Sequence, residues 1–549
     1  MYGLAFPIRR MAITLIFVGG SVPLIARGQT WDGYAGNAQH TALSAVASQP
    51  LQGIHWQTPV DLDPQLWGSD LYAHYGSPVI TGANTVIVPV KTGAAGGFEL
   101  NAFNGATGSL LWTQNTDYAL PPTTGEFGGA TYSWTPPYGP ALAGGNALYY
   151  AGAGGTVYER TGLDSSGSVT PAQQAFYGSL STYQANAAAY NAGVAISTPI
   201  TADAQGDIYF GYQTTNSAPG GLTSGIARIS ASGAGSFFQA SALMVNGVSA
   251  GMNQVVMNSA PAVTPDGSTV YVAMSAGGNF GPGRLVALNT ASMTPTASAV
   301  LTDAFTGTAA GLPNDGTASP MIGPDGDVYM GVFDNEGTSR GWMDHFSASL
   351  TPINAGGFGW DDTASVVPAS MVKSYTGTSK YLIMTKYNNY ADPGAGGDGK
   401  NMIAILDPNA TETDTRNNSN ESGATIMKVV ESIVGPTPDP DFDATNPGAV
   451  HEWCINSAVV DPATDSILVN SEDGNLYRWD LGSNTLTEQI NITAGLGEAY
   501  TPTAIGPDGT VYAINDATLF AIGAVPEPSA LMALGMGFGA MLCARVRKR

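Results

Sequence analysis

A repeat of about 60 residues runs through most of this 549-residue chain and constrains its fold more than any other feature. Each copy begins with a small residue and a proline, followed by a short apolar strand, a turn and a second strand. The first five copies start at Pro78, Pro140, Pro199, Pro261 and Pro320, spaced by 62, 59, 62 and 59 residues. A fixed period of this kind is typical of repeat architectures.

The turn inside the repeat has a physical basis. Pro265-Asp266-Gly267, Pro324-Asp325-Gly326 and Pro507-Asp508-Gly509 each lead into a strand that contains Val-Tyr. Proline presets φ, aspartate bonds back to the backbone, and glycine accepts a positive φ. The flanking Val, Ile and Tyr residues suit pleated, half-buried positions. Each copy is therefore predicted to form antiparallel β-strands.

About four strands per copy, repeated eight times, predict an all-β chain folded as a β-propeller with eight four-stranded blades. Two weaker copies, at residues 366–384 and 457–469, fill the interval before Pro502, and the count is seven if they form one blade. A parallel β-helix is the main competing fold, but its repeats are shorter and more uniform. No sustained 3.6-residue periodicity between the two ends supports a helical solenoid.

The two ends of the repeat region are incomplete in complementary ways. A lone strand-like segment, Gly53–Val60, precedes the first copy, whereas the last copy ends early at Leu519–Ile522. An open sheet edge presents unpaired backbone groups. We therefore expect the N-terminal segment to complete the last blade and close the ring.

The N-terminus has the features of a secretory signal peptide. Arg9 and Arg10 precede an uncharged run over residues 11–26, and Ala26 and Gly28 supply small residues at the −3 and −1 positions of a cleavage site. Glycine and proline interrupt the apolar run, and a polar sequence follows it. Residues 1–28 are thus predicted to be removed on export rather than to form a membrane anchor.

The C-terminus has three parts in a fixed order. Val525, Pro526, Glu527 and Pro528 are followed by an uncharged, Gly-spaced apolar run over residues 529–544, and then by four basic residues. A helix of about 16 residues reaches ~24 Å, which spans most of a bilayer core if the basic side chains extend to the interface. The basic end is expected on the cytoplasmic side, which places the rest of the chain outside.

This tail resembles the PEP-CTERM sorting signal of envelope proteins in Gram-negative bacteria. We assign residues 525–549 to it, with Val525, Pro526, Glu527 and Pro528 as the sorting motif. The resemblance implies recognition by an exosortase-type membrane protease and transient anchoring in the inner membrane. It also implies cleavage near the motif and transfer to the cell surface or to an extracellular polysaccharide matrix.

The body resembles the PQQ-like, quinoprotein-type β-propeller family. The resemblance rests on the opening Trp31–Ser44 and on the repeat end Ala102…Thr107-Gly108…Trp112. We assign residues 29–524 to this propeller. The family contains quinone dehydrogenases as well as non-catalytic scaffolds, so the resemblance implies a fold more than an activity.

Charge excludes one class of partner. The chain has 19 Lys and Arg against 42 Asp and Glu. Three of the bases lie in residues 1–28 and four lie after Ser529, and neither segment has an acid, so the remaining body carries 12 bases against 42 acids, a net charge of −30. Nucleic-acid binding needs basic patches. An acidic exported body instead suits solubility and contact with divalent cations.

Two acidic segments are the candidates for a calcium site. Asp392 and Asp398 lie in a glycine-rich loop, and Asp439, Asp441 and Asp443 occupy alternate positions in a second segment. If that second segment is extended, alternation places its three carboxylates on one face. Neither segment matches the EF-hand spacing. The surrounding insertion, residues 410–446, is predicted to be an exposed loop because it is rich in Asp, Asn, Thr and Pro.

Catalytic motifs are sparse. A quinone-dependent dehydrogenase needs a stacking platform, a Ca²⁺ site and an Asp base, and Trp360-Asp361-Asp362 with Trp453 are the residues that supply such groups. Family dehydrogenases often have adjacent cysteines beneath the cofactor, whereas Cys454 stands alone. No zinc-type histidine spacing occurs, and the His451…Cys454 pair is interpreted as structural because neighbouring side chains on a strand alternate faces.

The sequence therefore favours a surface-displayed, non-enzymatic propeller that binds an envelope protein or exopolysaccharide. The alternative is an enzyme, either a PQQ- and Ca²⁺-dependent dehydrogenase or a glycan-active protein with a site in the central channel. The sequence assigns no catalytic or cofactor-binding residue, disfavours PQQ, and leaves calcium open. A channel mouth that gathers acids, histidine and aromatic residues would favour the second reading.

Overall fold

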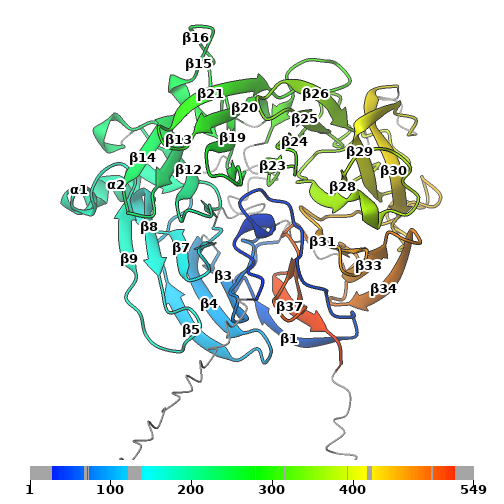
Figure 1. The fold of residues 1–549 in the computed structure, drawn as a ribbon, viewed down its shortest axis with the longest axis horizontal. Coiled ribbons are helices and arrows are strands. Elements are labelled where there is room, and N and C mark those ends of the chain that lie inside the picture. The colour runs from blue at the N-terminus through cyan, green and yellow to red at the C-terminus, as the bar shows by residue number, and fades with distance from the viewer. Residues whose placement is uncertain are drawn as a thin grey trace, which may run out of the picture.

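The computed structural model describes residues 28–66, 71, 73–94, 96–121, 138–216, 218–278, 280–313, 316–391, 394–416, 423–495 and 499–525. These residues form eight β-sheets arranged around a central axis and a ninth, two-stranded sheet of β15 (Met244–Val245) and β16 (Val248–Ser249) (Figure 1). The predicted all-β propeller with eight blades is confirmed. The two weaker repeats form separate blades, which excludes the seven-blade count.

The first four blades span residues 79–312. Their strands are β2 (Val79–Ile80), β3 (Thr85–Gly93), β4 (Gly96–Asn104) and β5 (Leu110–Asn115) in blade 1; β6 (Ala141–Ala143), β7 (Ala147–Ala151), β8 (Thr156–Arg160) and β9 (Ala172–Ala175) in blade 2; β10 (Val194–Ile196), β11 (Thr201–Ala202), β12 (Ile208–Thr214), β13 (Gly225–Ile229) and β14 (Gly235–Gln239) in blade 3; and β17 (Gln254–Val255), β18 (Ala262–Val263), β19 (Thr269–Ser275), β20 (Gly281–Asn289), β21 (Thr294–Val300) and β22 (Gly311–Leu312) in blade 4.

The other four blades are four-stranded. Their strands are β23 (Met321–Ile322), β24 (Val328–Val332), β25 (Trp342–Phe346) and β26 (Pro352–Gly356) in blade 5; β27 (Ser365–Pro368), β28 (Tyr381–Lys386), β29 (Met402–Thr413) and β30 (Thr425–Val434) in blade 6; β31 (Val459–Asp461), β32 (Ser466–Asn470), β33 (Asn475–Asp480) and β34 (Thr485–Asn491) in blade 7; and β35 (Ala504–Ile505), β36 (Val511–Asn515), β37 (Thr518–Gly523) and β1 (Gly53–Pro59) in blade 8.

The N-terminal strand closes the ring as predicted. Strand β1 pairs antiparallel with β37, from Gly53 opposite Gly523 to Pro59 opposite Thr518. The indole of Trp56 donates to the Gly105 carbonyl of blade 1 at 2.7 Å. Blade 8 is therefore built from both ends of the chain, which hides the edge that β37 would otherwise expose.

The repeat turn works as its sequence indicates. The Asp266 carboxylate accepts from the Ser268 backbone N–H at 3.1 Å, and Gly267 has a φ of +69°. Asp508 makes the same contact with Thr510 at 3.1 Å. A side chain with a Cβ is strained at this φ, which explains the glycine.

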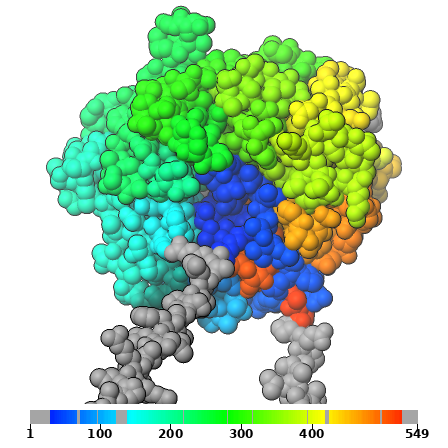
Figure 2. Space-filling view, viewed as in Figure 1, coloured from blue at the N-terminus to red at the C-terminus, as the bar shows by residue number. Residues whose placement is uncertain are grey.

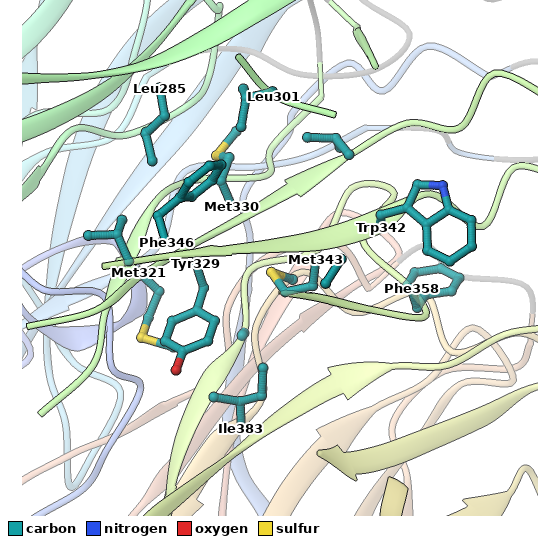
Figure 3. Packing of buried hydrophobic residues seen from close by; sticks show 14 of the residues in the cluster. Leu285, Leu301, Met321, Tyr329, Met330, Trp342, Met343, Phe346, Phe358 and Ile383 are labelled. Atoms are coloured by element: carbon teal, nitrogen blue, oxygen red, sulfur yellow. The ribbon is translucent and has the colours of Figure 1, made fainter. Parts of the chain in front are cut away.

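The hydrophobic core lies between adjacent blades. Figure 3 shows side chains of blade 5, among them Met330 and the fully buried Trp342, together with Leu285 of blade 4 and Ile383 of blade 6 in one cluster. Neighbouring blades therefore contribute apolar side chains to shared clusters, and several such clusters follow one another around the ring.

Two local features differ from the sequence interpretation. Blade 3 carries two short helices, α1 (Leu180–Ala185) and α2 (Ala187–Gly193). The prediction that residues 410–446 form an exposed loop is wrong, because β30 and the end of β29 lie within them and pair with each other. The β-branched residues of β30 outweigh the polar composition that surrounds them.

The N-terminal segment, residues 29–49, circles the axis and is here called the strap. Its Trp31 exchanges two 2.9 Å backbone hydrogen bonds with Ile80 of blade 1, and its carbonyls accept the N–H groups of innermost strands in later blades. These pairs are Asp32 with Leu142, Ala38 with Val263, Gln39 with Ile322, Thr41 with Val366 and Ala42 with Val460.

Figure 2 shows the strap at the centre of one face of the propeller, between the blades. The innermost strands have one edge turned to the axis, and backbone groups there need partners once they are buried. The strap supplies those partners in the order of blades 1, 2, 4, 5, 6 and 7 and closes this end of the axis.

Most of the two export segments lies outside the described residues. Gly28 and Val525 are described, whereas Ala26, Pro526, Glu527 and Pro528 are not. Within the described part of the chain, no helix is long and apolar enough to span a membrane, and the apolar run predicted to do so lies beyond it.

Candidate functional site

Polar side chains meet on the propeller axis next to the strap. They come from the segments that lead into the innermost strands of different blades: His74 before β2, Thr317 before β23, Asp361 before β27 and Tyr500 before β35. Because every blade turns the same repeat position toward the axis, residues far apart in sequence converge there. We call these four residues the axial cluster.

The axial cluster is tightly connected. His74 Nε2 lies 3.3 Å from Asp361 Oδ2, and His74 Nδ1 lies 3.1 Å from Thr317 Oγ1. The backbone N–H of Thr317 donates to Asp361 Oδ1 at 2.8 Å. The ring of Tyr500 stacks on His74, with centroids 3.9 Å apart and planes 15° apart. These contacts fix the imidazole in position.

Tyr34 of the strap reaches the axial cluster from the other side. It lies in the short 3₁₀ turn η1 (Tyr34–Gly36). Its hydroxyl donates to the Thr317 carbonyl at 3.0 Å, lies 2.8 Å from Thr363 Oγ1 and contacts Asn456 Oδ1. The strap is thus anchored to blades 5, 6 and 7 through one side chain.

Burial shifts the pKa values of the titratable groups near the axis. Burial lowers the pKa of His74 to about 4, and Lys386 acts in the same direction while Asp361 opposes it. Burial raises the pKa of Asp362 well above its ordinary value, although Lys386 lowers it. The ammonium of Lys386 lies 5.8 Å from the Tyr500 ring centre. The buried Lys386 therefore acts electrostatically on both His74 and Asp362.

A small cavity lies beside His74. It is lined by Tyr34, His74, Asn258 and Tyr500 among others and has a volume of about 20 Å³, room for one or two water molecules. Asn258 is 2% exposed, and neither atom of its amide has a partner among the described residues. Buried amides are normally hydrogen-bonded. Ordered water in this cavity is the simplest partner for Asn258.

A second cluster lies at blade 7 and combines Glu452, Cys454, Glu472 and His451. Cys454 Sγ donates to Glu472 Oε2 at 3.2 Å, and His451 Nδ1 lies 3.1 Å from Glu472 Oε1. The ligand atoms of Glu452, Cys454 and Glu472 all lie within 4.8 Å of one another, a spacing compatible with a metal ion. The sequence analysis names His451 and Cys454, as a structural pair, and does not anticipate Glu472, which follows β32.

The calcium candidates are not brought together in this way. Asp392 lies outside the described residues. Asp398 Oδ1 accepts from Asn389 and from the Lys400 N–H at 2.8 and 3.1 Å. Asp439 Oδ1 accepts from the Asp441 N–H at 2.9 Å. Both carboxylates therefore stabilise local turns.

The expected one-face arrangement of Asp439, Asp441 and Asp443 is not formed. The Asp443 N–H donates to the Asp439 carbonyl at 3.0 Å, so the segment is a tight turn rather than an extended strand. Alternation of faces applies only to an extended backbone. The shared-face argument for calcium therefore does not apply to this segment, and calcium binding by its carboxylates stays a prediction.

A comparison with known families identifies the tail. Residues 524–548 match the family described as the PEP-CTERM protein-sorting motif. The chain carries a PEP-CTERM signal. This motif implies export to the cell envelope of a Gram-negative bacterium and processing by an exosortase-type system. The predicted sorting residues Val525, Pro526, Glu527 and Pro528 lie inside the match.

The PEP-CTERM protein resembles solved propeller structures over most of its length. One is a europium-containing methanol dehydrogenase, with 10% sequence identity, a TM-score of 0.52 and coverage of 89% of each chain. Another is the quinohemoprotein alcohol dehydrogenase from Comamonas testosteroni, with 11% identity, a TM-score of 0.52 and coverage of 92% of this chain and 82% of that one. At this identity the likeness confirms the quinoprotein-type fold. A comparison with curated protein sequences gives no match.

The cavity beside His74 does not fit a tricyclic quinone. Its volume of about 20 Å³ suits water, and Tyr34, His74 and Tyr500 line it. Cys454 is buried, and the second cysteine of the chain, Cys543, belongs to the sorting tail. The cavity beside His74 therefore has an imidazole and aromatic rings in its lining but no room for a stacked cofactor.

Proposed function

We propose that this chain is an exported, surface-displayed propeller that binds an envelope protein or exopolysaccharide and catalyses no reaction. The observation that carries the proposal is the closed axis. The strap bonds to the innermost strands of six blades at one end, and the axial cluster is buried behind it. The strap therefore shields the axial cluster from this end, which favours binding at the exposed faces of the propeller over chemistry at the cluster.

The charge of the body supports an extracellular role. A net charge of −30 keeps a displayed protein soluble and disfavours binding to nucleic acid. On this proposal the tail anchors the chain in the inner membrane until an exosortase-type protease cleaves it near Pro526-Glu527-Pro528. The product reaches the outer surface or the extracellular matrix.

Mass spectrometry of the protein recovered from the cell surface tests this fate. We expect the signal peptide and everything after the Pro526-Glu527-Pro528 region to be missing. A matched variant with these three residues replaced by alanine is expected to keep its tail and stay with the inner membrane. Recovery of surface protein with an intact Arg549 would contradict the proposal.

The second candidate is a PQQ- and Ca²⁺-dependent dehydrogenase or a glycan-active enzyme. The convergence of His74, Asp361, Asp362 and Lys386 near the axis favours it, as does the fold shared with two alcohol dehydrogenases. Dye-linked oxidation of a panel of alcohols, after incubation with PQQ and Ca²⁺, separates the candidates. The binding proposal expects no turnover, and turnover that is lost in Asp361→Asn would establish the enzyme.

A further inference from the structure

A groove separates the outer strand of blade 1 from the middle strands of blade 2. Its volume is about 370 Å³, within the range of small-ligand sites. The lining residues end or follow β5, lie on β7 and β8, or precede β9: Gln114, Asn115, Thr116, Asp117, Tyr150, Tyr158 and Pro171. We call this surface the tyrosine groove.

The polar groups of the tyrosine groove are held in place. Asp117 Oδ1 accepts from the Ala153 N–H at 3.0 Å, and its Oδ2 accepts from the Tyr158 hydroxyl at 3.2 Å. Thr116 Oγ1 donates to the Ala151 carbonyl at 2.7 Å. A carboxylate fixed in this way can accept further hydrogen bonds, because each of its oxygens has two lone pairs. Fixed groups bind a ligand with little loss of entropy.

The hydroxyl of Tyr150 is buried beside the groove. The residue is 1% exposed and lines the groove, yet its hydroxyl has no hydrogen-bond partner among the described residues. A buried hydroxyl normally has a partner. Because this oxygen is closed to solvent, Tyr150 contributes its ring to the groove wall and not its hydroxyl to a ligand.

The two tyrosine rings offer apolar surface beside these polar groups. Tyr150 and Tyr158 stack with centroids 5.5 Å apart and planes 21° apart, and Tyr158 is half-buried. Pro171 adds a saturated, apolar ring to the lining. Aromatic rings flanked by amide and carboxylate groups suit a ligand with C–H faces and hydroxyl edges.

The charges around the tyrosine groove favour a neutral ligand over an anionic one. The seven lining residues include one carboxylate and no base. The nearby guanidinium of Arg160 is 2% exposed, stacks 4.0 Å from the Trp112 ring centre and donates to Gln114 Oε1 at 3.0 Å. The Arg160 guanidinium therefore already makes its contacts within the protein. A polyanion would meet Asp117 without a compensating cation, in a body of net charge −30.

We propose that the tyrosine groove binds a neutral saccharide, with Tyr158 packing against a sugar ring and Asp117 and Asn115 bonding to its hydroxyl groups. This inference rests on the proposed role as a surface-displayed binding propeller, and it assigns that role to one site and one class of ligand.

Calorimetric titration of the purified exported protein tests the groove. The probes are neutral hexasaccharides of β-1,4-linked and α-1,4-linked glucose, and a hexasaccharide of galacturonic acid as the anionic comparison. We expect a neutral probe to bind and the anionic probe to bind at least about tenfold more weakly. Tyr158→Ala and Asn115→Ala should each weaken neutral binding by about tenfold, which corresponds to ~1.4 kcal/mol.

The matched control is Phe237→Ala, which removes a 37%-exposed aromatic residue from β14 of blade 3 and should leave binding unchanged. Asn115 is exposed, so its variant separates lost contacts from lost folding. Absence of binding by the neutral probes, preference for the anionic probe, or neutral binding by both groove variants as tight as that of the unaltered protein overturns the inference. Surface display with a cleaved tail, measured separately, would then still support the proposed function.

Discussion

At the scale of single residues, the buried histidine His40 makes stability depend on pH. Burial lowers its pKa to about 4, and its Nδ1 lies 2.7 Å from the Pro320 carbonyl. Its Nε2 has no partner among the described residues. Protonation therefore favours the unfolded chain, whose histidines titrate near pH 6.5.

We expect the free energy of unfolding to fall by about 2–3 kcal/mol from this residue alone as the pH drops from 6.5 toward 4. His40→Asn should reduce that pH dependence, because asparagine tolerates the φ of +60° found at this position. Urea unfolding at pH 7 and pH 4.5 measures the difference. The exposed His55→Asn variant is the control, and an unchanged slope in His40→Asn would refute the assignment.

The buried ion pair between Lys91 and Asp61 is a second residue-scale feature. Lys91 Nζ lies 2.7 Å from both oxygens of Asp61, which also accepts from the Tyr75 hydroxyl at 2.8 Å. Lys91→Met leaves this carboxylate buried without its cation and is expected to cost about 3–5 kcal/mol. The double variant Asp61→Asn/Lys91→Met should be more stable than the single one. Urea unfolding measures the free energy of unfolding of both variants. Equal losses in the single and the double variant would argue against the cost of a buried, unpaired charge.

At the scale of elements, strand β1 links the last blade to the first. Trp56 of β1 packs on Phe103 of blade 1 and Tyr512 of blade 8, with ring centres 5.5 and 5.8 Å away. Trp56→Ala removes these contacts and the bond to the Gly105 carbonyl, and we expect a loss of about 3 kcal/mol.

Ile54→Ala on the same strand is the matched comparison. Ile54 is 38% exposed, so its truncation should cost less than about 1 kcal/mol. Thermal unfolding of both variants measures the difference. Equal, small effects would show that β1 closes the ring through its backbone alone.

At the scale of the whole molecule, the acidic body should be stabilised by salt. With 42 acids against 12 bases, the compact state carries strong self-repulsion. The screening length falls from about 30 Å at 0.01 M salt to ~8 Å at 0.15 M. We therefore expect the midpoint of thermal unfolding to rise by a few degrees over this range, equally in NaCl and KCl. A fall in the midpoint would mean that attractive surface pairs dominate.

The sequence by itself determined the blades and their closure. Proline spacing, Pro-Asp-Gly turns and alternating strands are local signals, since each depends on φ preferences and on the period of side chains within a few residues. The early end of the last copy and the spare strand at Gly53–Val60 were enough to predict how the ring closes. The sorting tail could also be predicted from the sequence, because its three parts follow one another in the chain.

Tertiary structure alone decided the axis and the sites. Tyr34 contacts Asn456 across 422 positions of sequence, and the axial cluster draws single residues from four different repeats. The strap, the Glu472 contact to Cys454 and the tyrosine groove arise in the same way. Repeat patterns specify each blade, but only the closed ring brings equivalent positions of different blades within hydrogen-bond distance.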